Sequence, residues 1–262
     1  MSENGMYNDL IHSAVDAVKQ AAKVLRTFSS DSLKVNWKPD DSPVTEADLA
    51  ADELITGVLQ STGVPIVSEE HFDLSKDGRK SWESFWVVDP LDGTKEFMHG
   101  RPQYAVNIGL IHKGKPVLGV IALPEYNRVY AGYVGKGMAR FEEGVSEFTS
   151  LMMPDHPIDP KLPFTALVSR SHMHPATSKY LDKLREKHPD LVVEPSGSAT
   201  KFCRVAEGSA HIYPRHTPCM IWDTAAGDAL LNSVGKGIYR FSDGKSLDYL
   251  SQQIINPPFI VR

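Results

Sequence analysis

Two aspartates close a buried apolar run in the stretch WVVDPLDGTKEF, which spans residues 86–97. Asp89 and Asp92 stand three residues apart around a proline, and like charges at that spacing repel each other unless a cation lies between them. Three further acidic segments stand at the ends of expected elements: Asp48, Glu69-Glu70 and Asp223. Because no histidine or cysteine accompanies these carboxylates, the set favours a hard cation with oxygen ligands, above all Mg²⁺.

Each acidic segment also has an interpretation that needs no metal. The alternatives are a capping box for Thr45 and Asp48, an N-cap for Asp223, a turn for Asp89 and Asp92, and a solvated loop for Glu69-Glu70. The occurrence of all these segments in one chain, each at an element end, favours a shared metal site.

The residues after the second aspartate favour an anion site beside the metal. A helix that begins at Gly93-Thr94 would direct free N–H groups at an anion, and glycine has no side chain to block a phosphate. The preceding Pro90-Leu91 turn would aim the Leu91 carbonyl inward as one more oxygen ligand. Together these features predict metal-assisted phosphoester hydrolysis, in which Thr94 and Asp48 orient and deprotonate a water.

The composition is that of a globular protein and excludes several functional classes. The chain has 262 residues, 41% hydrophobic and 23% charged, with a net charge of −5 and no long basic block, which argues against a nucleic-acid polymer as partner. We find no secretory signal and no apolar run near the ~20 residues of a membrane-spanning helix. The two cysteines, Cys203 and Cys219, are expected in the core, which fits a reducing cytoplasm. A peripheral association with the inner membrane is left open.

Hydrophobic periodicity predicts two helices and an antiparallel sheet for residues 1–150. One amphipathic helix is expected over 5–29, and a second opens at 44–48. Strands follow at VPIV, FWVV, YAVNIGLIH, KPVLGVIAL, RVYAGYV and GMARFEE. Lys113-Gly114 predicts a hairpin between the third and fourth of these runs.

The pattern breaks at the proline-rich residues 150–163, after which strands and helices alternate. We therefore expect a metal-binding α+β subdomain over 1–155 and an α/β substrate-binding subdomain over 156–262. Helices are predicted at 175–188, at 198–207 and from Asp223 onward. The site is expected at the seam between the two subdomains.

Four ordered motifs resemble those of the inositol monophosphatase superfamily of lithium-sensitive, magnesium-dependent phosphatases. They are SPVTEAD (42–48), SEE (68–70), DPLDGTKEF (89–97) and WDTAAGDALL (222–231), and they span almost the whole chain. Within the superfamily, Lys95-Glu96-Phe97 is similar to the bacterial 3′(2′),5′-bisphosphate nucleotidase branch. The resemblance implies the layered α-β-α-β-α fold of sugar phosphatases. One departure is Gly235-Lys236-Gly237, where the superfamily often has paired glycines.

The resemblance also implies roles for individual residues. It implies two or three Mg²⁺ ions held by Glu69, Asp89, the Leu91 carbonyl, Asp92 and Asp223. It implies catalytic roles for Asp48, Glu69 and Thr94, phosphate binding by Gly93 and Thr94, and further substrate contacts from Leu91, Asp92 and Asp223.

A second anion pocket is expected in the C-terminal half, because a nucleoside bisphosphate carries a second phosphate. The candidate residues are Ser169 and His172 in the segment SRSH, Gly197, Ser198, Lys201 and Arg215. Ordinary surface charge is the alternative for Lys201 and for Arg170 of the same segment.

The expected reaction removes the 3′-phosphate of adenosine 3′,5′-bisphosphate to give AMP, with the sulfated nucleotide as a further substrate. The expected partner is thus a small molecule, and the chain is a monomer or homodimer. Inositol or sugar monophosphate hydrolysis is the alternative. A covalent aspartyl-phosphate mechanism is disfavoured because it needs a D-x-D pair, and nothing favours a sensor without turnover.

Overall fold

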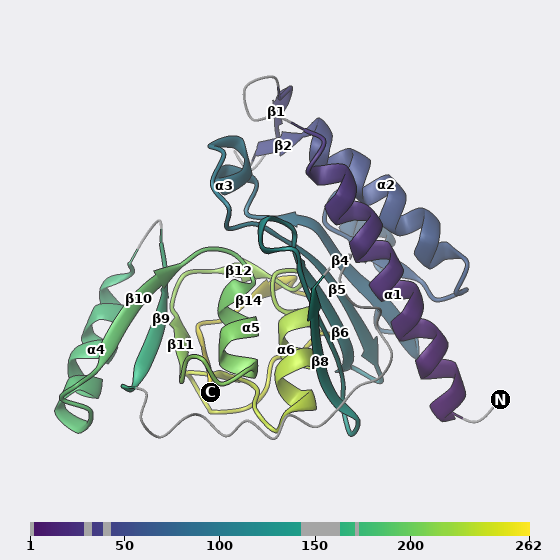
Figure 1. Cartoon of the computed structure of the whole chain (residues 1–262). Helices are drawn as coiled ribbons and strands as arrows, with labels where there is room; N and C mark the ends of the chain where they lie inside the picture. The colour runs from purple at the N-terminus through teal and green to yellow at the C-terminus, as the bar shows by residue number, and fades with distance from the viewer. Residues whose placement is uncertain (1–2, 29–32, 39–42, 143–162, 171–172) are drawn as a thin grey trace.

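The computed structural model describes residues 3–28, 33–38, 43–142, 163–170 and 173–262. Its elements stack as helices, sheet, helices, sheet and helix (Figure 1), which confirms the predicted layered α-β-α-β-α arrangement. Among the described residues, no helix is both long enough and apolar enough to cross a membrane.

A six-stranded sheet forms the first β layer. Its strands, in spatial order, are β3 (Ile66–Ser68), β4 (Ser84–Asp92), β5 (Ala105–His112), β6 (Lys115–Leu123), β7 (Arg128–Tyr133) and β8 (Gly137–Glu142). The pairs from β4 to β8 are antiparallel as predicted, whereas β3 runs parallel to β4. The long connection over residues 69–83, which includes the short helix η2 (Leu74–Lys76), permits this because parallel neighbours need a crossover.

Two long helices, α1 (Glu3–Leu25) and α2 (Glu46–Gln60), cover the outer face of this sheet. Buried alanines at helical spacing, such as Ala14, Ala17 and Ala21, let α1 approach its neighbours closely. Helix α2 begins at a capping box in which Thr45 and Asp48 satisfy each other's backbone donors.

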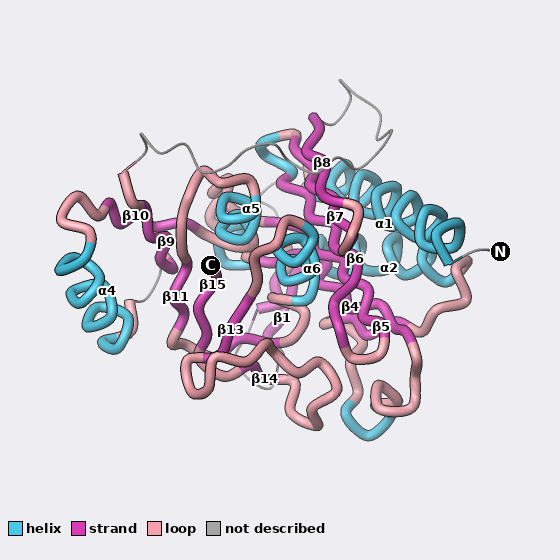
Figure 2. The backbone as a smooth tube through the Cα atoms, turned by 90° about the horizontal axis from the view of Figure 1, so that it is seen from below, coloured by secondary structure: helices cyan, strands magenta, loops and turns pink. Residues whose placement is uncertain are grey.

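The other face of the sheet is covered by α5 (Thr200–Ala206) and α6 (Ala225–Ser233), which Figure 2 shows between the two β layers. Two glycines of the sheet make this approach close. A Cβ atom on Gly119 would lie 2.1 Å from the Ala226 carbonyl oxygen, and one on Gly109 would lie 2.8 Å from Ala226 N. Helix α6 begins two residues after Asp223, because Thr224 rather than the aspartate occupies the N-cap position.

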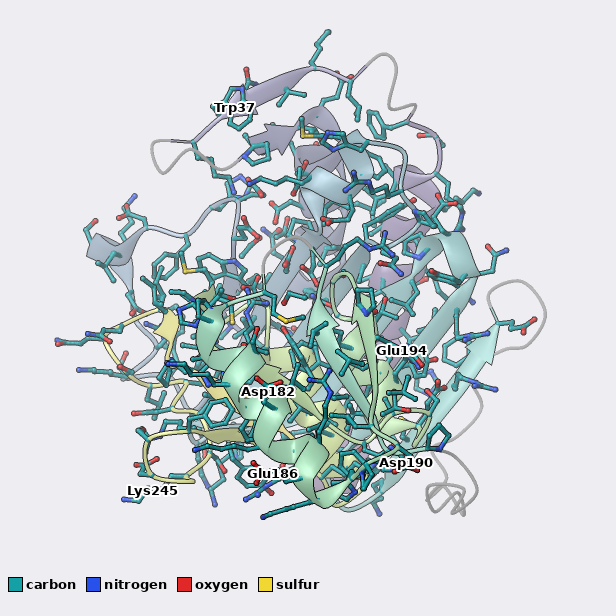
Figure 3. The ribbon with its side chains drawn as sticks, turned by 90° about the vertical axis from the view of Figure 1, so that its left-hand side faces the viewer. Trp37, Asp182, Glu186, Asp190, Glu194 and Lys245 are labelled. Atoms are coloured by element: carbon teal, nitrogen blue, oxygen red, sulfur yellow. The ribbon has the colours of Figure 1, made fainter. Side chains whose placement is uncertain are left out.

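The second β layer combines a parallel and an antiparallel part. The parallel pair is β9 (Thr165–Ser169) with β10 (Val192–Ser196), and the antiparallel set is β11 (Tyr213–Arg215), β15 (Phe259–Val261) and β13 (Ile238–Arg240). A bridge between Ala166 and Ile212 joins the two parts. Helix α4 (Pro175–Lys187) packs Leu181 on this layer, and Figure 3 shows Asp182 and Glu186 on its opposite side.

Shorter elements complete the description. They are the ribbon β1 (Val35–Trp37) with β2 (Pro43–Thr45), the ribbon β12 (Cys219–Met220) with β14 (Ile255–Asn256), the helix α3 (Thr94–Met98) and the short helix η3 (Pro124–Tyr126). Lys113 and Gly114, both with positive φ, form the predicted hairpin turn between β5 and β6.

The main core cluster draws residues from both halves of the chain, including Val87 and Ile121 from the first sheet and Leu230 and Phe259 from the C-terminal half. Cys203 and Cys219 are buried and unbridged within it, as predicted. The predicted break at 150–163 and the division between 155 and 156 lie in or beside residues 143–162, outside the described part of the chain. The subdomain division therefore stays a prediction.

Candidate metal centre and adjoining pocket

Three aspartates from distant parts of the chain converge at the end of β4. One carboxylate oxygen each from Asp89, Asp92 and Asp223 lies within 4.8 Å of the others. On β4, Asp89 pairs with Asn107 and Asp92 with Ala105, with a shift of register between them. Because proline has no N–H to continue the ladder, the Pro90-Leu91 step interrupts the pairing of β4 with β5, and both carboxylates lie near Asp223.

The electrostatics of this cluster call for a cation. Burial raises the pKa of Asp89 well above its usual range, and the charges of Glu69, Asp92 and Asp223 raise it further. Burial and the charge of Asp92 likewise raise the pKa of Asp223 to about 7. A divalent cation would remove this repulsion, and a set made only of carboxylate and carbonyl oxygens fits Mg²⁺.

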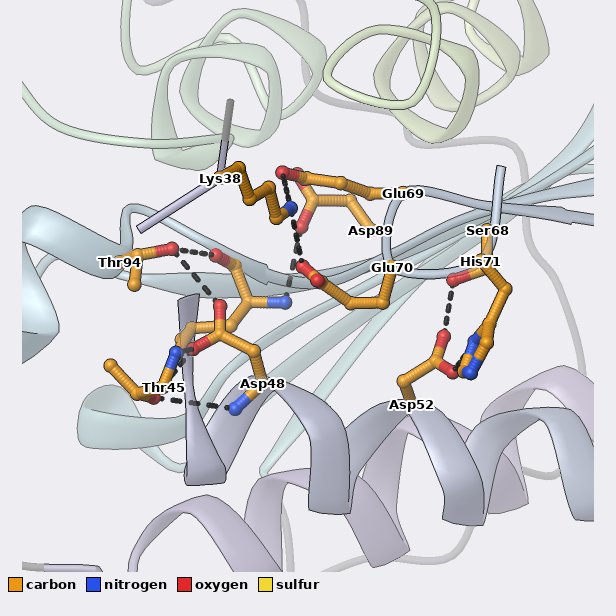
Figure 4. Close-up of polar contacts among 11 residues, drawn as sticks. Lys38, Thr45, Asp48, Asp52, Ser68, Glu69, Glu70, His71, Asp89 and Thr94 are labelled. Atoms are coloured by element: carbon orange, nitrogen blue, oxygen red, sulfur yellow. Dashed lines mark hydrogen bonds and ion pairs between the residues drawn. The ribbon is translucent and has the colours of Figure 1, made fainter. Parts of the chain in front are cut away.

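Glu69 and Glu70 occupy the turn that follows β3, beside the aspartate cluster (Figure 4). The Lys38 ammonium donates to Glu69 Oε1 and to Glu70 Oε1, both at 2.9 Å. Burial raises the pKa of Glu70 to about 7, an effect that Lys38 opposes and the charge of Glu69 strengthens. Lys38 was not predicted as a site residue, since nothing in its polar loop marks it.

Asp48 faces both its helix and the site. Its Oδ2 accepts the Thr45 N–H at 2.8 Å, which closes the capping box, while its Oδ1 lies 3.1 Å from the Thr94 hydroxyl. The Thr94 hydroxyl also lies 3.2 Å from the Leu91 carbonyl oxygen, and the Leu91 N–H donates to Asp89. Burial raises the pKa of Asp48, which makes this carboxylate a better proton acceptor.

Gly93 precedes α3 in a left-handed conformation with φ of 98°. A side chain would be strained there, and a Cβ atom would lie 3.1 Å from the Gln103 carbonyl oxygen. Glycine is therefore required where the chain turns from Asp92 into Thr94.

A pocket of about 330 Å³ opens beside the cluster, toward the C-terminal half. Predicted residues in its wall are Asp92, Gly93, Ser169, Gly197, Ser198, Lys201, Arg215 and Asp223. Arg170 of the candidate segment SRSH also lines it, as do Glu96, Ser196, Phe202, Tyr213, Thr217 and Pro218, which the prediction did not assign. His172 lies outside the described residues. Of the remaining predicted residues, Asp48, Glu69, Asp89, Leu91 and Thr94 stand beside the pocket rather than in its wall.

The cations of the pocket differ in how firmly the fold holds them. Lys201 is buried and donates to the carbonyl oxygens of Ser196 and Ser198 at 3.0 and 2.7 Å, and burial lowers its pKa to about 8. Arg215 donates to the Thr217 and Pro218 carbonyl oxygens. Arg170 is exposed in the pocket wall. Surface charge is thus wrong as an interpretation of Lys201.

Ser198 connects the pocket with the acidic cluster. Its hydroxyl donates to Asp92 Oδ2 at 2.7 Å, and the Gly197 N–H next to it donates to the Gln103 side chain at 2.9 Å. These bonds join the turn before α5 to Asp92 at the end of β4 and to Gln103, which lies shortly before β5.

Comparison with known proteins gives relatives along the whole chain. A family model described as the inositol monophosphatase family matches residues 6–259. The chain is 40% identical over 256 residues to the 3′(2′),5′-bisphosphate nucleotidase CysQ of Salmonella typhimurium strain LT2, and 38% identical over 255 residues to that of Escherichia coli strain K12; 96% of each chain is covered in both cases.

Solved structures agree with these relatives. The structure of CysQ from Bacteroides thetaiotaomicron, a bacterial member of the inositol monophosphatase family, superposes with a TM-score of 0.85 at 36% identity and 97% coverage of each chain. The suhB protein of Bartonella henselae shares the fold, with a TM-score of 0.73 at 24% identity and coverage of 97% of this chain and 93% of that one. The chain belongs to the inositol monophosphatase family.

Proposed function

We propose that this protein is a Mg²⁺-dependent phosphatase that converts adenosine 3′,5′-bisphosphate and water to AMP and inorganic phosphate. The observation that carries the proposal is the acidic cluster of Asp89, Asp92 and Asp223 opening directly into a pocket with Arg170 and Arg215 in its wall. The two features suit a substrate with two phosphates. The printed names of the curated relatives support the same substrate class.

The residues proposed to hold two or three Mg²⁺ ions are Glu69, Asp89, the Leu91 carbonyl, Asp92 and Asp223. Their raised carboxyl pKa values support this assignment, because acidic groups forced together in a buried site are stabilised by a divalent charge. Bound Mg²⁺ would polarise the phosphoryl group and make a nearby water more acidic.

The chain's own residues would orient the water and receive its proton. The Thr94 hydroxyl lies between the Asp48 carboxylate and the Leu91 carbonyl, so it can orient a water against Asp48. In the hydrolysis, water oxygen bonds to phosphorus, the bond from phosphorus to the ribose 3′ oxygen breaks, and Asp48 takes up the proton that water releases. The departing 3′ oxygen takes a proton from solvent and becomes the 3′-hydroxyl of AMP. Gly93 and Thr94 are proposed to contact the scissile phosphate.

The second phosphate is proposed to lie near Arg170, with Ser169 and Gly197 beside it in the pocket wall. Lys201 and Arg215 would act on the second phosphate mainly through their positive charge, because N–H groups of both side chains already donate to backbone carbonyl oxygens. The sulfated nucleotide carries the same 3′-phosphate, and we propose it as a further substrate. An inositol monophosphate would leave the pocket's cations without an anion, which makes that alternative the weaker one.

A substrate panel tests the proposal. Phosphate release is measured from adenosine 3′,5′-bisphosphate, its sulfated form and inositol 1-phosphate, each across a Mg²⁺ titration and in the presence of a chelator. We expect the bisphosphate to be hydrolysed fastest, activity to vanish with the chelator, and millimolar lithium to inhibit. Faster turnover of inositol phosphate would favour the alternative, and binding without turnover would indicate a sensor.

A further inference from the structure

A second buried carboxylate of α2 lies directly behind the turn that carries Glu69 and Glu70. Asp52 follows Asp48 by four residues, so the two side chains project from the same face of the helix, one turn apart. Asp48 reaches Thr94 at the acidic cluster, whereas the fully buried Asp52 points at the other side of the Glu69–Glu70 turn (Figure 4). Nothing in the proposed reaction uses Asp52.

The Asp52 carboxylate holds both ends of that turn. The Ser68 hydroxyl donates to Asp52 Oδ1, and His71 Nδ1 lies 2.6 Å from Asp52 Oδ2. The backbone N–H of His71 also donates to the backbone carbonyl oxygen of Ser68 at 3.2 Å, which closes the turn. Ser68 and His71 thus point back toward α2, and the two glutamates between them point the other way, to Lys38 and the aspartates (Figure 4).

The contacts of Asp52 with Ser68 and His71 act on the conformation of the turn more than on core packing. The His71 side chain is 68% exposed, so it contributes little buried apolar area, and its contact with Asp52 acts mainly on the conformation of the turn. The Asp52 side chain has no exposed area. Loss of Ser68 would leave Oδ1 buried without its donor, and loss of His71 would take away the polar neighbour of Oδ2, which accepts no hydrogen bond from the described residues. The free-energy cost of an uncompensated buried carboxylate favours one conformation of the turn.

We propose that Asp52, with Ser68 and His71, is a positioning residue that fixes the Glu69–Glu70 turn in the conformation required to bind the divalent cation. The inference rests on the proposed metal-dependent function and adds residues that act through the glutamates rather than on the substrate. Partners that orient metal ligands from behind typically change metal affinity by about 10–100-fold when removed.

The test measures Mg²⁺ binding by isothermal titration calorimetry on the full, metal-free chain, without substrate. We expect His71→Ala to raise the Mg²⁺ dissociation constant about 10-fold, and a melting curve shows that the variant is folded at the temperature of the titration. Lys76→Ala is the matched control, since Lys76 is an exposed residue of the same connection that pairs only with Asp73 among the described residues. It should bind Mg²⁺ like the wild type.

Two further variants separate positioning from folding. Asp52→Asn keeps an oxygen for Ser68 and a polar group beside His71 Nδ1, so its Mg²⁺ dissociation constant should lie closer to that of the wild type than that of His71→Ala does. Ser68→Ala removes the other contact and should weaken Mg²⁺ binding as His71→Ala does. Unchanged Mg²⁺ affinity in both His71→Ala and Ser68→Ala overturns the inference.

The wild type distinguishes this inference from the proposed function. The protein could bind Mg²⁺ in a manner that depends on His71 and yet hydrolyse none of the phosphate esters. That result would support the positioning role and contradict the proposed activity. Hydrolysis of the bisphosphate by a protein whose Mg²⁺ affinity does not depend on His71 or Ser68 would support the proposed activity and overturn the positioning role. Absence of Mg²⁺ binding by the wild type would overturn both.

Discussion

Asp48 uses its two carboxylate oxygens for different tasks. One closes the capping box with Thr45, and the other faces the Thr94 hydroxyl at the edge of the acidic cluster. The sequence favoured either a helix cap or a reactive carboxylate, and the structure accommodates both in a single side chain. Asp223 behaves similarly, since Oδ2 accepts the Met220 N–H while the residue joins the aspartate cluster.

Replacing Asp89 by asparagine should separate activity from stability. We expect Asp89→Asn to lower phosphatase activity by at least about 100-fold, because a proposed metal ligand loses its charge. The same change should raise the melting temperature of the metal-free protein, since it removes a buried carboxyl group from a repulsive cluster. Calorimetric melting with a chelator checks this. Asp182→Asn on the exposed side of α4 should change neither quantity, and a less stable metal-free Asp89→Asn would contradict the repulsion.

Arg170 offers the cleanest probe of the second phosphate, since it lines the pocket yet is exposed. We expect Arg170→Ala to raise KM for adenosine 3′,5′-bisphosphate about 10-fold or more, because a charge-assisted contact is lost. Turnover of a 3′-monophosphate that lacks the second group should be unchanged. Arg185→Ala, which removes an exposed arginine of α4, is the control. Equal effects on both substrates would place the second phosphate elsewhere.

Residues that pair only after folding escaped prediction. Lys38, Asp52 and Glu96 carry no periodic signal, and each could as well be a solvated charge in the sequence. Their roles become visible when segments far apart in the chain meet: Lys38 with the turn after β3, Asp52 with His71, and Glu96 in the wall of the pocket. The aspartates were predictable because each ends an element.

At the scale of elements, long periodic segments were predicted well and several short ones were missed. The two N-terminal helices, the strands of the first sheet and α4 lie within a few residues of their predicted bounds. Of the strands with two or three residues, β3 was predicted as VPIV, whereas β1, β2, β12, β14 and β15 were not, because so short a run shows little alternation. The parallel pairing of β3 could not be inferred either, because the run of residues itself does not set strand direction.

The contact of α6 with the first sheet sets the position of Asp223. A Cβ atom on Gly119 would lie 2.1 Å from the Ala226 carbonyl oxygen, so Gly119→Ala must push α6 outward. We expect this variant to lose about 1–3 kcal/mol of unfolding free energy and to lose activity as Asp223 moves. Chemical denaturation and phosphate release measure the two effects.

Gly57→Ala on α2 is the matched control for that change. A Cβ atom on Gly57 meets no atom within 4 Å, and the residue lies inside a helix. We expect a gain of about 0.5–1 kcal/mol, because alanine favours helix over glycine, and unchanged activity. A stable Gly119→Ala protein would show that the interface between α6 and the sheet has more freedom than its packing indicates.

At the scale of the whole molecule, the site lies where the layers meet. The first sheet supplies Asp89 and Asp92, α2 supplies Asp48, and the residues leading into α6 supply Asp223, while the second β layer closes the pocket with Ser169 and Arg215. Four ordered motifs were enough to predict this convergence. The shape of the pocket was not predictable, because it depends on how far α5 and the second β layer stand from β4.

The acidic cluster should make the stability of the molecule depend on pH and, through the proposed metal site, on Mg²⁺. The pKa values of Asp223 and Glu70 are about 7 in the folded chain, against ordinary values of 3.8 and 4.5, and that of Asp89 is also raised. Between pH 4 and 7 these groups hold more protons when folded than when unfolded. Their contribution to stability is therefore present at low pH and lost as pH rises through that window.

With the proposed ligand set, Mg²⁺ should reverse this loss, because it would bind Asp89 and Asp223 in their deprotonated form and only in the folded chain. At a concentration 100-fold above its dissociation constant, Mg²⁺ adds about 2.7 kcal/mol, or roughly 5–10 °C in melting temperature for a chain of this size. We expect that increment at pH 8 and a much smaller one at pH 5.5, where protons compete for the same oxygens. Asp223→Asn should reduce the increment at pH 8 toward its value at pH 5.5. An increment equal at the two pH values in the wild type would mean that the ion binds away from these carboxylates.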